Sequence, residues 1–198
     1  MLQQLSTVYG EHLTATAWTV YPRPQMKRDS YINLNGDWEF GLSPKEYDQK
    51  IRVPFCPESV LSGVNLHFPE GSRLFYRRII TLPEGFCRGR LLLHIGAADQ
   101  TARVYVNGRL AGDHQGIGCF CVDVTDFWRD GENEITISCQ DDLKDQSFPY
   151  GKQTQHRGGM WYTPVSGIWQ TVWLESVPET YIEKLNIENR GYSVTISV

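Results

Sequence analysis

Ser166-Gly-Ile-Trp-Gln-Thr-Val-Trp-Leu-Glu175 is the stretch of this 198-residue chain that decides its fold. From Ile168 onward its side chains alternate between two faces of an extended strand, Ile168, Val172 and Leu174 on one and Trp169, Thr171 and Trp173 on the other. Both faces are largely apolar. We therefore expect both to be covered, as in a strand of a β-sandwich.

The segment before this strand is of a different kind. Gly158, Gly159 and Pro164 break regular structure, and Trp161 and Tyr162 lie among them, just after the polar run 151–157. Aromatic rings stack on the C–H bonds of a sugar, and Lys, Gln, His and Arg side chains form directed hydrogen bonds with its hydroxyls. The loop therefore has the composition of a sugar-facing surface.

The rest of the chain also indicates β-structure. From Tyr31 onward short strand patterns alternate with turn signals, and no long helical period appears. Asn107-Gly108 predicts a type I′ hairpin turn, which needs positive φ at both positions. Residues 125–129 predict one helical turn capped by Thr125 and ended by Asp130-Gly131. Strands this numerous and this closely spaced predict an all-β protein with a β-sandwich.

Both ends of the chain depart from this pattern. Residues 1–30 predict an irregular lead-in, in which Tyr21-Pro-Arg-Pro-Gln25 favours extended or turn backbone and offers no helix. After Val177-Pro178, strands are expected at 181–187 and 192–198, with a turn at 189–191. The last strand has no closing turn, and a protein rarely ends on a strand whose edge is left unpaired. We expect the sequence to be a piece of a longer protein.

Composition excludes several classes of protein. Hydrophobic residues make up 40% and charged residues 21%, which is typical of a globular domain, and the net charge is −4. Without a basic block, nucleic acid and membrane are not expected as partners. No apolar run approaches the roughly 18 residues that span a bilayer. The first twenty residues resemble no signal peptide, so a cytoplasmic location is expected.

The cysteines do not suggest a disulfide framework or a metal site. They are five in number, an odd count, and lie at scattered positions: 56, 87, 119, 121 and 139. Cys119 and Cys121 share one face of a strand, but one intervening residue is too few for the usual metal-ligand spacing. We expect buried free thiols, with no metal and no cofactor.

Six pieces of the sequence, in the same order, resemble the N-terminal sugar-binding domain of glycoside hydrolase family 2. That family contains β-galactosidases, β-glucuronidases and β-mannosidases. The pieces are Leu34-Asn-Gly-Asp-Trp-Glu-Phe40, Val53-Pro-Phe-Cys-Pro-Glu-Ser59, Phe75-Tyr-Arg-Arg78, Val104-Tyr-Val-Asn-Gly108, the turn region from Asp123 to Glu134, and the 166–175 run quoted above.

The resemblance implies a domain organisation. It sharpens the fold to a jelly-roll β-sandwich at 31–178, after the lead-in at 1–30, and makes 179–198 the start of an immunoglobulin-like domain. In the family the two catalytic glutamates lie in a later (β/α)₈ barrel, so this chain receives no catalytic residue. The implied function is the non-catalytic part of a hydrolase of β-glycosides, β-galactoside first, which works with its own immunoglobulin-like and barrel domains; a homo-oligomer of the full-length enzyme is compatible with it.

The alternative is a stand-alone, lectin-like carbohydrate-binding module without catalysis. The unfinished last strand favours the enzyme part, because a stand-alone module should complete its own sheet. Retaining glycoside hydrolysis needs two carboxyl groups about 5–5.5 Å apart. Asp141-Asp142, the one adjacent acidic pair, points to opposite faces on a strand and is expected in a solvated turn.

The resemblance also implies which residues face the sugar. The loop before Met160-Trp161 would reach the barrel mouth, which makes Lys152, Gln153, His156, Arg157 and Trp161 the candidate substrate-binding residues. The alternatives left open are a solvated loop, a contact with another domain, and a core position for Trp161.

Two further residue positions bear on these assignments. Gly158-Gly159 stand where large β-galactosidases carry an acidic residue, so a sodium site through that carboxylate is not expected. His94 lies in an apolar strand and is expected to be a core histidine rather than a ligand.

Overall fold

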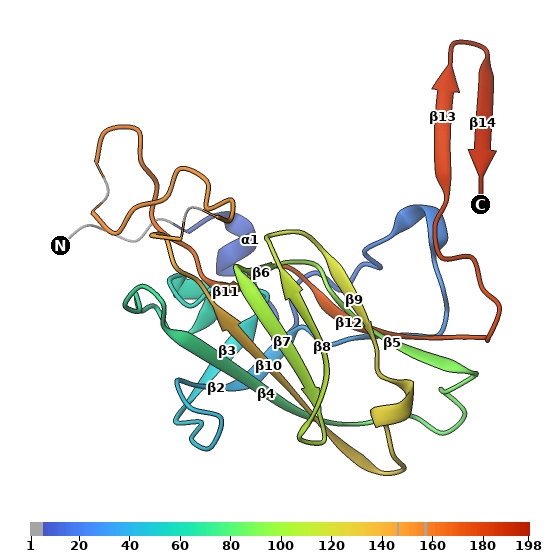
Figure 1. Ribbon diagram of the computed structural model, residues 1–198, viewed down its shortest axis with the longest axis horizontal. Helices are drawn as coiled ribbons and strands as arrows, with labels where there is room; N and C mark the ends of the chain where they lie inside the picture. The colour runs from blue at the N-terminus through green and yellow to red at the C-terminus, as the bar shows by residue number, and fades with distance from the viewer. Residues whose placement is uncertain (1–5, 146, 157) are drawn as a thin grey trace.

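The computed structural model describes residues 6–145, 147–156 and 158–198, and its main body is a jelly-roll β-sandwich of two antiparallel sheets (Figure 1). The four-stranded sheet has the order β1 (Tyr31–Asn33), β12 (Val172–Val177), β5 (Arg90–Ile95), β9 (Phe120–Asp123). The six-stranded sheet has the order β3 (Gln49–Val53), β2 (Gly36–Gly41), β4 (Arg73–Thr81), β10 (Glu132–Gln140), β7 (Thr101–Val106), β8 (Arg109–Gln115). The all-β prediction is confirmed.

The core lies between the two sheets. Alternate residues of each strand point inward, so that Trp38, Phe40 and Tyr76 of the six-stranded sheet meet Leu93 and other aliphatic side chains of the four-stranded sheet. The rings of Phe40 and Tyr76 make an edge contact, with centroids 5.2 Å apart. The predicted inward set of Ile168, Val172 and Leu174 is confirmed, because all three are fully buried.

The strand expected from Ile168 to Glu175 is divided in two. β11 (Gly167–Ile168) pairs with β6 (Ala98–Asp99), and β12 begins only at Val172. Between them Trp169 donates its backbone N–H to Ala97, and Thr171 accepts one from Gly96, at 3.2 and 2.8 Å. The expectation that both faces of this strand are covered is confirmed at Trp173, which is 5% exposed. It is wrong at Trp169, which lies at the break and is 39% exposed.

Turn chemistry was predicted well at one site and less well at another. Asn107 and Gly108 have φ of 51° and 77° and join β7 to β8, as expected. The helical turn near 125 is the 3₁₀ segment η3 (Thr125–Phe127). The expected cap at Thr125 is wrong, because the N-cap position is Val124, which has no capping side chain. Asp123 Oδ1 accepts the Thr125 N–H at 3.0 Å.

The lead-in contains two short helices, α1 (Val8–Glu11) and the 3₁₀ segment η1 (Pro24–Met26). The prediction of no helix at 21–25 is therefore wrong at its end. Proline suits the first turn of a helix, because its φ is fixed near the helical value and its missing N–H would have no partner there.

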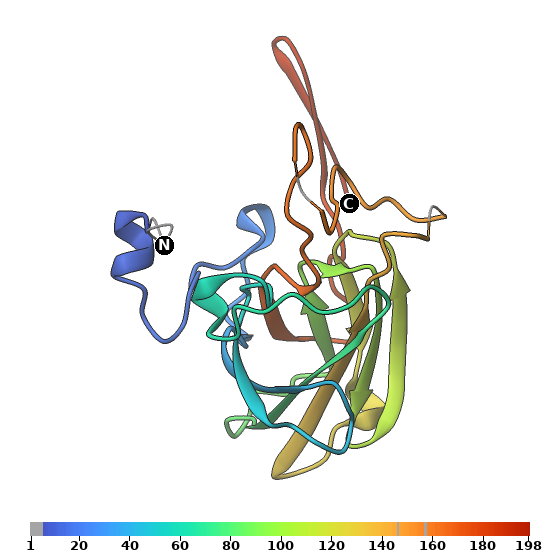
Figure 2. The ribbon, with the colours of Figure 1, turned by 90° about the vertical axis from the view of Figure 1, so that its left-hand side faces the viewer.

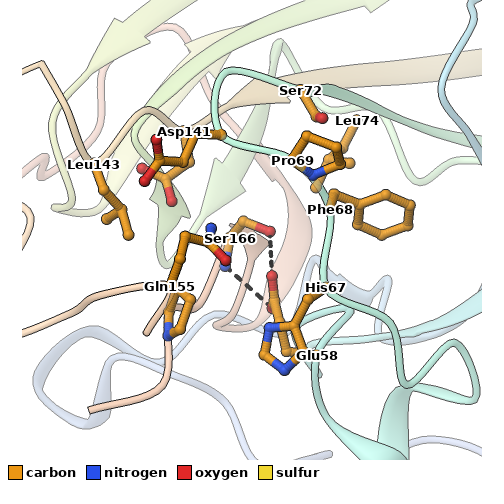
Figure 3. A pocket seen from close by; sticks show the side chains of 12 residues that line it. Glu58, His67, Phe68, Pro69, Ser72, Leu74, Asp141, Leu143, Gln155 and Ser166 are labelled. Carbon is orange, nitrogen blue, oxygen red and sulfur yellow. Dashed lines mark hydrogen bonds between the residues drawn. The ribbon is translucent and has the colours of Figure 1, made fainter. Parts of the chain in front are cut away.

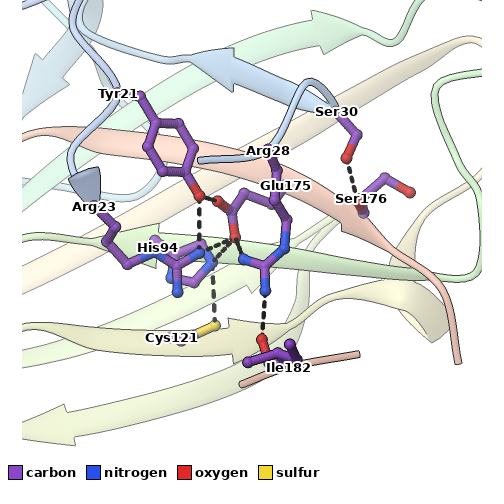
Figure 4. Close-up of polar contacts among 9 residues, drawn as sticks. All are labelled: Tyr21, Arg23, Arg28, Ser30, His94, Cys121, Glu175, Ser176 and Ile182. Atoms are coloured by element: carbon purple, nitrogen blue, oxygen red, sulfur yellow. Dashed lines mark hydrogen bonds and ion pairs between the residues drawn. The ribbon is translucent and has the colours of Figure 1, made fainter. Parts of the chain in front are cut away.

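A cluster of charged side chains fastens the lead-in to the outer face of the four-stranded sheet (Figure 4). Its centre is Glu175 on β12, which is 0% exposed. Tyr21 and Arg23 donate hydrogen bonds to this carboxylate, and Arg28 Nη1 and His94 Nε2 lie 3.0 and 3.1 Å from its Oε2. Burial alone would raise the pKa of Glu175, but bonds from His94, Arg23 and Tyr21 outweigh it and lower the pKa to about 2.

His94 is confirmed as a core histidine. It is buried, and its ring stacks on Trp173 with centroids 4.7 Å apart. Burial, opposed by the bond to Glu175, lowers its pKa. The expectation of buried cysteines holds for Cys139, but it is wrong for Cys87, Cys119 and Cys121, which are exposed. Cys121 lies on the sheet's edge strand β9, with its Sγ 3.8 Å from His94 Nε2.

The last strands form a separate hairpin, β13 (Asn186–Arg190) and β14 (Ser193–Ser197), which extends beyond the sandwich in both views (Figures 1 and 2). Its first strand starts five residues later than expected, at Asn186 rather than Tyr181. Tyr181 and Ile182 are instead held against the sandwich. Arg28 and Arg90 lie over the Tyr181 ring, and Arg28 donates to the Ile182 carbonyl at 2.6 Å. No helix in the described part of the chain is long and apolar enough to cross a membrane.

Candidate functional site

The candidate site lies at one end of the sandwich, where the long connection from β10 to β11 meets the loop that follows β3 (Figure 1). The short segment from Val165 to Ile168 is its base. Side chains from three other parts of the chain hold its backbone N–H groups. Val165 donates to Gln153 Oε1 at 2.6 Å, Ser166 to Glu58 Oε2 at 3.2 Å, and Ile168 to Tyr76 Oη at 3.3 Å.

Gly167 is the one residue of this base that must be glycine. Its φ is +70°, and a Cβ there would overlap the hydroxyl oxygen of Tyr76 and lie 3.2 Å from Leu74 Cδ1. Tyr76 is itself fully buried in the core and has no room to withdraw. The close approach of backbone to Tyr76 thus fixes where the loop joins the sandwich.

Carboxylates surround this base. Glu58 accepts a second hydrogen bond from Ser166 Oγ at 2.6 Å. Asp99 lies opposite Gly167 in the β6–β11 pair and is 4% exposed. Burial raises the pKa of Asp99 to about 6, against a lowering by the amide of Gln153. Burial, and then Asp99 and Glu58, raise the pKa of Asp141 to about 7. Asp141 is half-buried, so the expectation of a solvated turn residue is wrong for it.

A small pocket opens between Glu58, His67, Asp141, Gln155 and Ser166 (Figure 3). Its volume of about 20 Å³ suffices for roughly one water molecule. A sugar ring does not fit into it. A sugar that contacts this end of the sandwich would therefore lie outside this pocket.

The structure brings some of the predicted site residues together. Tyr162 donates its N–H to the Lys152 carbonyl at 2.8 Å, and Thr154 donates to the Tyr162 carbonyl at 3.2 Å, so two parts of the loop run side by side. Trp161, next to this ladder, is 45% exposed, and the alternative of a core tryptophan is wrong. Lys152 and His156 are exposed, and Gln153 is half-buried. Arg157 lies outside the described residues.

Three residues at the base of the loop, Glu58, Tyr76 and Asp99, were not singled out as site residues from the sequence. Glu58 and Tyr76 fall within sequence pieces that were recognised, but nothing in their spacing shows that they bind the backbone of residues more than 90 positions away. Asp99 lies in a strand of only two residues, which periodicity does not detect.

A larger hollow, of about 660 Å³, lies on the outer face of the four-stranded sheet between the lead-in and the 181–184 connection. His94 and Trp173 form its floor, but both are buried and stacked on each other, so neither offers a free ring face to a sugar. Among the described residues, no group of three or more His, Cys, Asp or Glu side chains is arranged to hold a metal ion.

Similar proteins were found by sequence and by structure, although no protein-family model matches the chain. A protein of Formosa agariphila named "Putative beta-glucuronidase" is 32% identical over 195 residues, which cover 92% of this chain and 23% of that protein. The "Beta-galactosidase" of Thermoanaerobacter pseudethanolicus is 27% identical over 174 residues, which cover 80% and 22%. The chain thus spans less than a quarter of the length of these curated relatives.

Solved structures share its fold. The beta-D-glucuronidase of Dictyoglomus thermophilum superposes with a TM-score of 0.64 at 22% identity, covering 89% of this chain and 33% of that one. The beta-D-mannosidase of the same organism gives 0.64 at 19% identity, covering 84% and 25%.

Proposed function

Because this chain is a β-sandwich domain of the glycoside hydrolase family 2 type, we propose that it is the non-catalytic N-terminal part of a β-glycosidase and forms one wall of the sugar pocket. The observation that carries the proposal is the anchored loop. It exposes the rings of Trp161 and Tyr162 beside Lys152, while its base is held to the core. An aromatic surface with a nearby donor suits the stacking and hydrogen bonding of a pyranose.

The proposed sugar-contacting residues are Trp161 and Lys152, with His156 and Arg157 from the same loop. The proposed substrate is a β-galactoside, in line with the name of one relative. A β-glucuronide is the second candidate, since another relative and several similar structures carry that name. Lys152 and His156 are exposed, and either would serve a uronate carboxylate as well as a hydroxyl.

The proposal extends to the parts of the molecule and their partners. Residues 1–30 are the lead-in, 31–178 the jelly roll, and 179–198 the first hairpin of an immunoglobulin-like domain. The exposed apolar side chains of β13 and β14, Ile187, Val194 and Ile196, support this, because they need a covering layer. The partners are a carbohydrate and the enzyme's own later domains. A cytoplasmic location agrees with five unpaired cysteines.

The isolated chain should be folded and catalytically silent, because the family places its catalytic glutamates in a later domain. We expect a β-type circular dichroism spectrum and no phenol release from aryl β-galactoside, β-glucuronide or β-mannoside. The full-length enzyme, assayed in parallel, should prefer one of the three and so identify the substrate. Turnover by pure isolated chain above a buffer blank would contradict the non-catalytic role.

In the full-length enzyme, Trp161→Ala should lower kcat/KM about tenfold, which corresponds to roughly 1.4 kcal/mol of transition-state stabilisation. The physical reason is the loss of one stacked ring from a pocket wall. Leu110→Ala is the matched control, because Leu110 is exposed on β8 beside the hairpin turn at the opposite end of the sandwich. The test is the steady-state kcat/KM of both variants beside that of the wild type. If Trp161→Ala behaves like the control, the loop does not face the sugar.

A further inference from the structure

We propose that Gln153 is a positioning residue, whose side-chain amide holds the sugar-facing loop against the sandwich, and that it does not itself bind the sugar. The sequence alone assigns Gln153 to substrate binding together with its neighbours. The contacts of its side chain give it a different role. The part of this inference that concerns the sugar rests on the proposed function, and the part that concerns the loop does not.

The amide of Gln153 is already occupied. Its Nε2 donates to the Tyr150 carbonyl at 2.7 Å, and its Oε1 accepts the Val165 N–H at 2.6 Å. The amide also lowers the pKa of the buried Asp99 carboxylate, against the larger effect of burial. A glutamine amide has two N–H donors and one acceptor oxygen. One donor and the acceptor oxygen of this amide are therefore used inside the protein, and these two bonds fix the orientation of the side chain.

These contacts join three parts of the chain. Tyr150 lies near the start of the loop, Val165 lies at its end, and Asp99 belongs to β6 of the sandwich. The backbone of Gln153 forms a bridge with Tyr162 in addition. Val165 is followed by Ser166, which Glu58 holds, so the Gln153 contact continues the line of bonds that closes the loop.

The position of Trp161 depends on this closure. Trp161 precedes Tyr162, the residue that pairs with the backbone around Gln153, and its own ring is not buried in the core. Without the amide, the Tyr150 carbonyl and the Val165 N–H lose their partners and the loop opens locally more often. A contact group that is displaced by about 1 Å can lose most of its effect on a reaction.

The first test needs no sugar. Gln153→Met keeps the length of the side chain and removes its hydrogen bonds. We expect amide hydrogen exchange of Val165 and Tyr162 in the 198-residue chain to become at least tenfold faster, while the amides of Ile135 and Ile137 in β10 exchange at the wild-type rate. Lys152→Ala is the control, because its exposed side chain should leave both sets unchanged. Unchanged exchange at Val165 and Tyr162 in Gln153→Met would overturn the proposal.

The second test separates positioning from direct binding in the full-length enzyme. If Gln153 acts through Trp161, then Gln153→Met lowers kcat/KM in the wild type but adds little once Trp161 is alanine. Independent sugar binding predicts that the two effects multiply, which would overturn the positioning role. Faster exchange without any kinetic effect of either substitution would leave the anchoring of the loop in place and would refute the proposed function instead.

Discussion

Gly167→Ala is expected to destabilise the sandwich by about 2–5 kcal/mol, through steric overlap and an unfavourable backbone conformation. The new methyl group would overlap the hydroxyl of Tyr76, and the φ of +70° is one that L side chains rarely adopt. Tyr76 cannot move aside easily, because it is fully buried and packs against Phe40. Urea unfolding followed by circular dichroism measures the loss.

The control for this substitution is Gly108→Ala. Gly108 has nearly the same backbone conformation, with φ of +77°, but no atom lies within 4 Å of the place its Cβ would take. It should therefore show only the backbone cost of about 1–2 kcal/mol. Adding Tyr76→Phe to Gly167→Ala should recover part of the loss. Equal destabilisation by the two alanines would mean that the junction is not tightly packed.

Glu175→Ala should cost about 3–5 kcal/mol, the usual penalty for removing one partner of a buried ion pair. Arg23, Arg28 and His94 all converge on this buried carboxylate, and without it two partly buried guanidinium groups lose their counter-charge. Glu39→Ala is the control, since Glu39 pairs with Arg77 at the surface, where such pairs contribute at most about 1 kcal/mol. A loss as small as that of the control would show that the cluster is not needed for the fold.

The same carboxylate gives a pH dependence of defined sign. Its pKa falls from the usual 4.5 to about 2 on folding, so the unfolded chain binds more protons between these values. The stabilisation is complete above about pH 5 and is lost as the pH falls toward 2. Burial raises the pKa of Asp99 and Asp141, so at these two groups the folded chain binds more protons than the unfolded chain. Their contribution to the free energy of unfolding therefore increases as the pH falls from about 7 to 4. The free energy of unfolding of the wild type and of Glu175→Gln, measured between about pH 5 and 2, isolates the contribution of Glu175. It should fall less steeply with pH in the variant.

What the sequence predicts well is what depends on neighbours along the chain. The alternation around Val172 and the Asn107-Gly108 pair are local, and both led to the observed strands and turn. The break at Trp169 was missed because period-two alternation looks the same in a continuous strand and in two short ones. The exposure of Trp161 was left open by the sequence, because a tryptophan near the end of a strand is often part of the core.

Pairings between distant residues could not be predicted. Glu175 looks like the polar end of a strand until Arg23 and Arg28, about 150 positions earlier, are seen beside it. Gln153 has the composition of a ligand-binding residue, and only the positions of Tyr150 and Val165 show that its amide is in use. Residue type indicates what a side chain can bond, whereas the fold decides which partner reaches it first.

The Glu175 cluster also determines where the chain can be shortened. A truncated protein that starts at Tyr31, where β1 begins, would keep every strand of the sandwich but would lose Tyr21, Arg23 and Arg28. The carboxylate would then be left with His94 alone, and the connection at 181–182 would lose its contacts with Arg28 and keep only that of Arg90 with Tyr181. Residues 21–28 of the lead-in thus connect β12 with the segment that follows it, and an affinity tag or a cleavage site belongs before Tyr21, near the exposed Val8 and Tyr9.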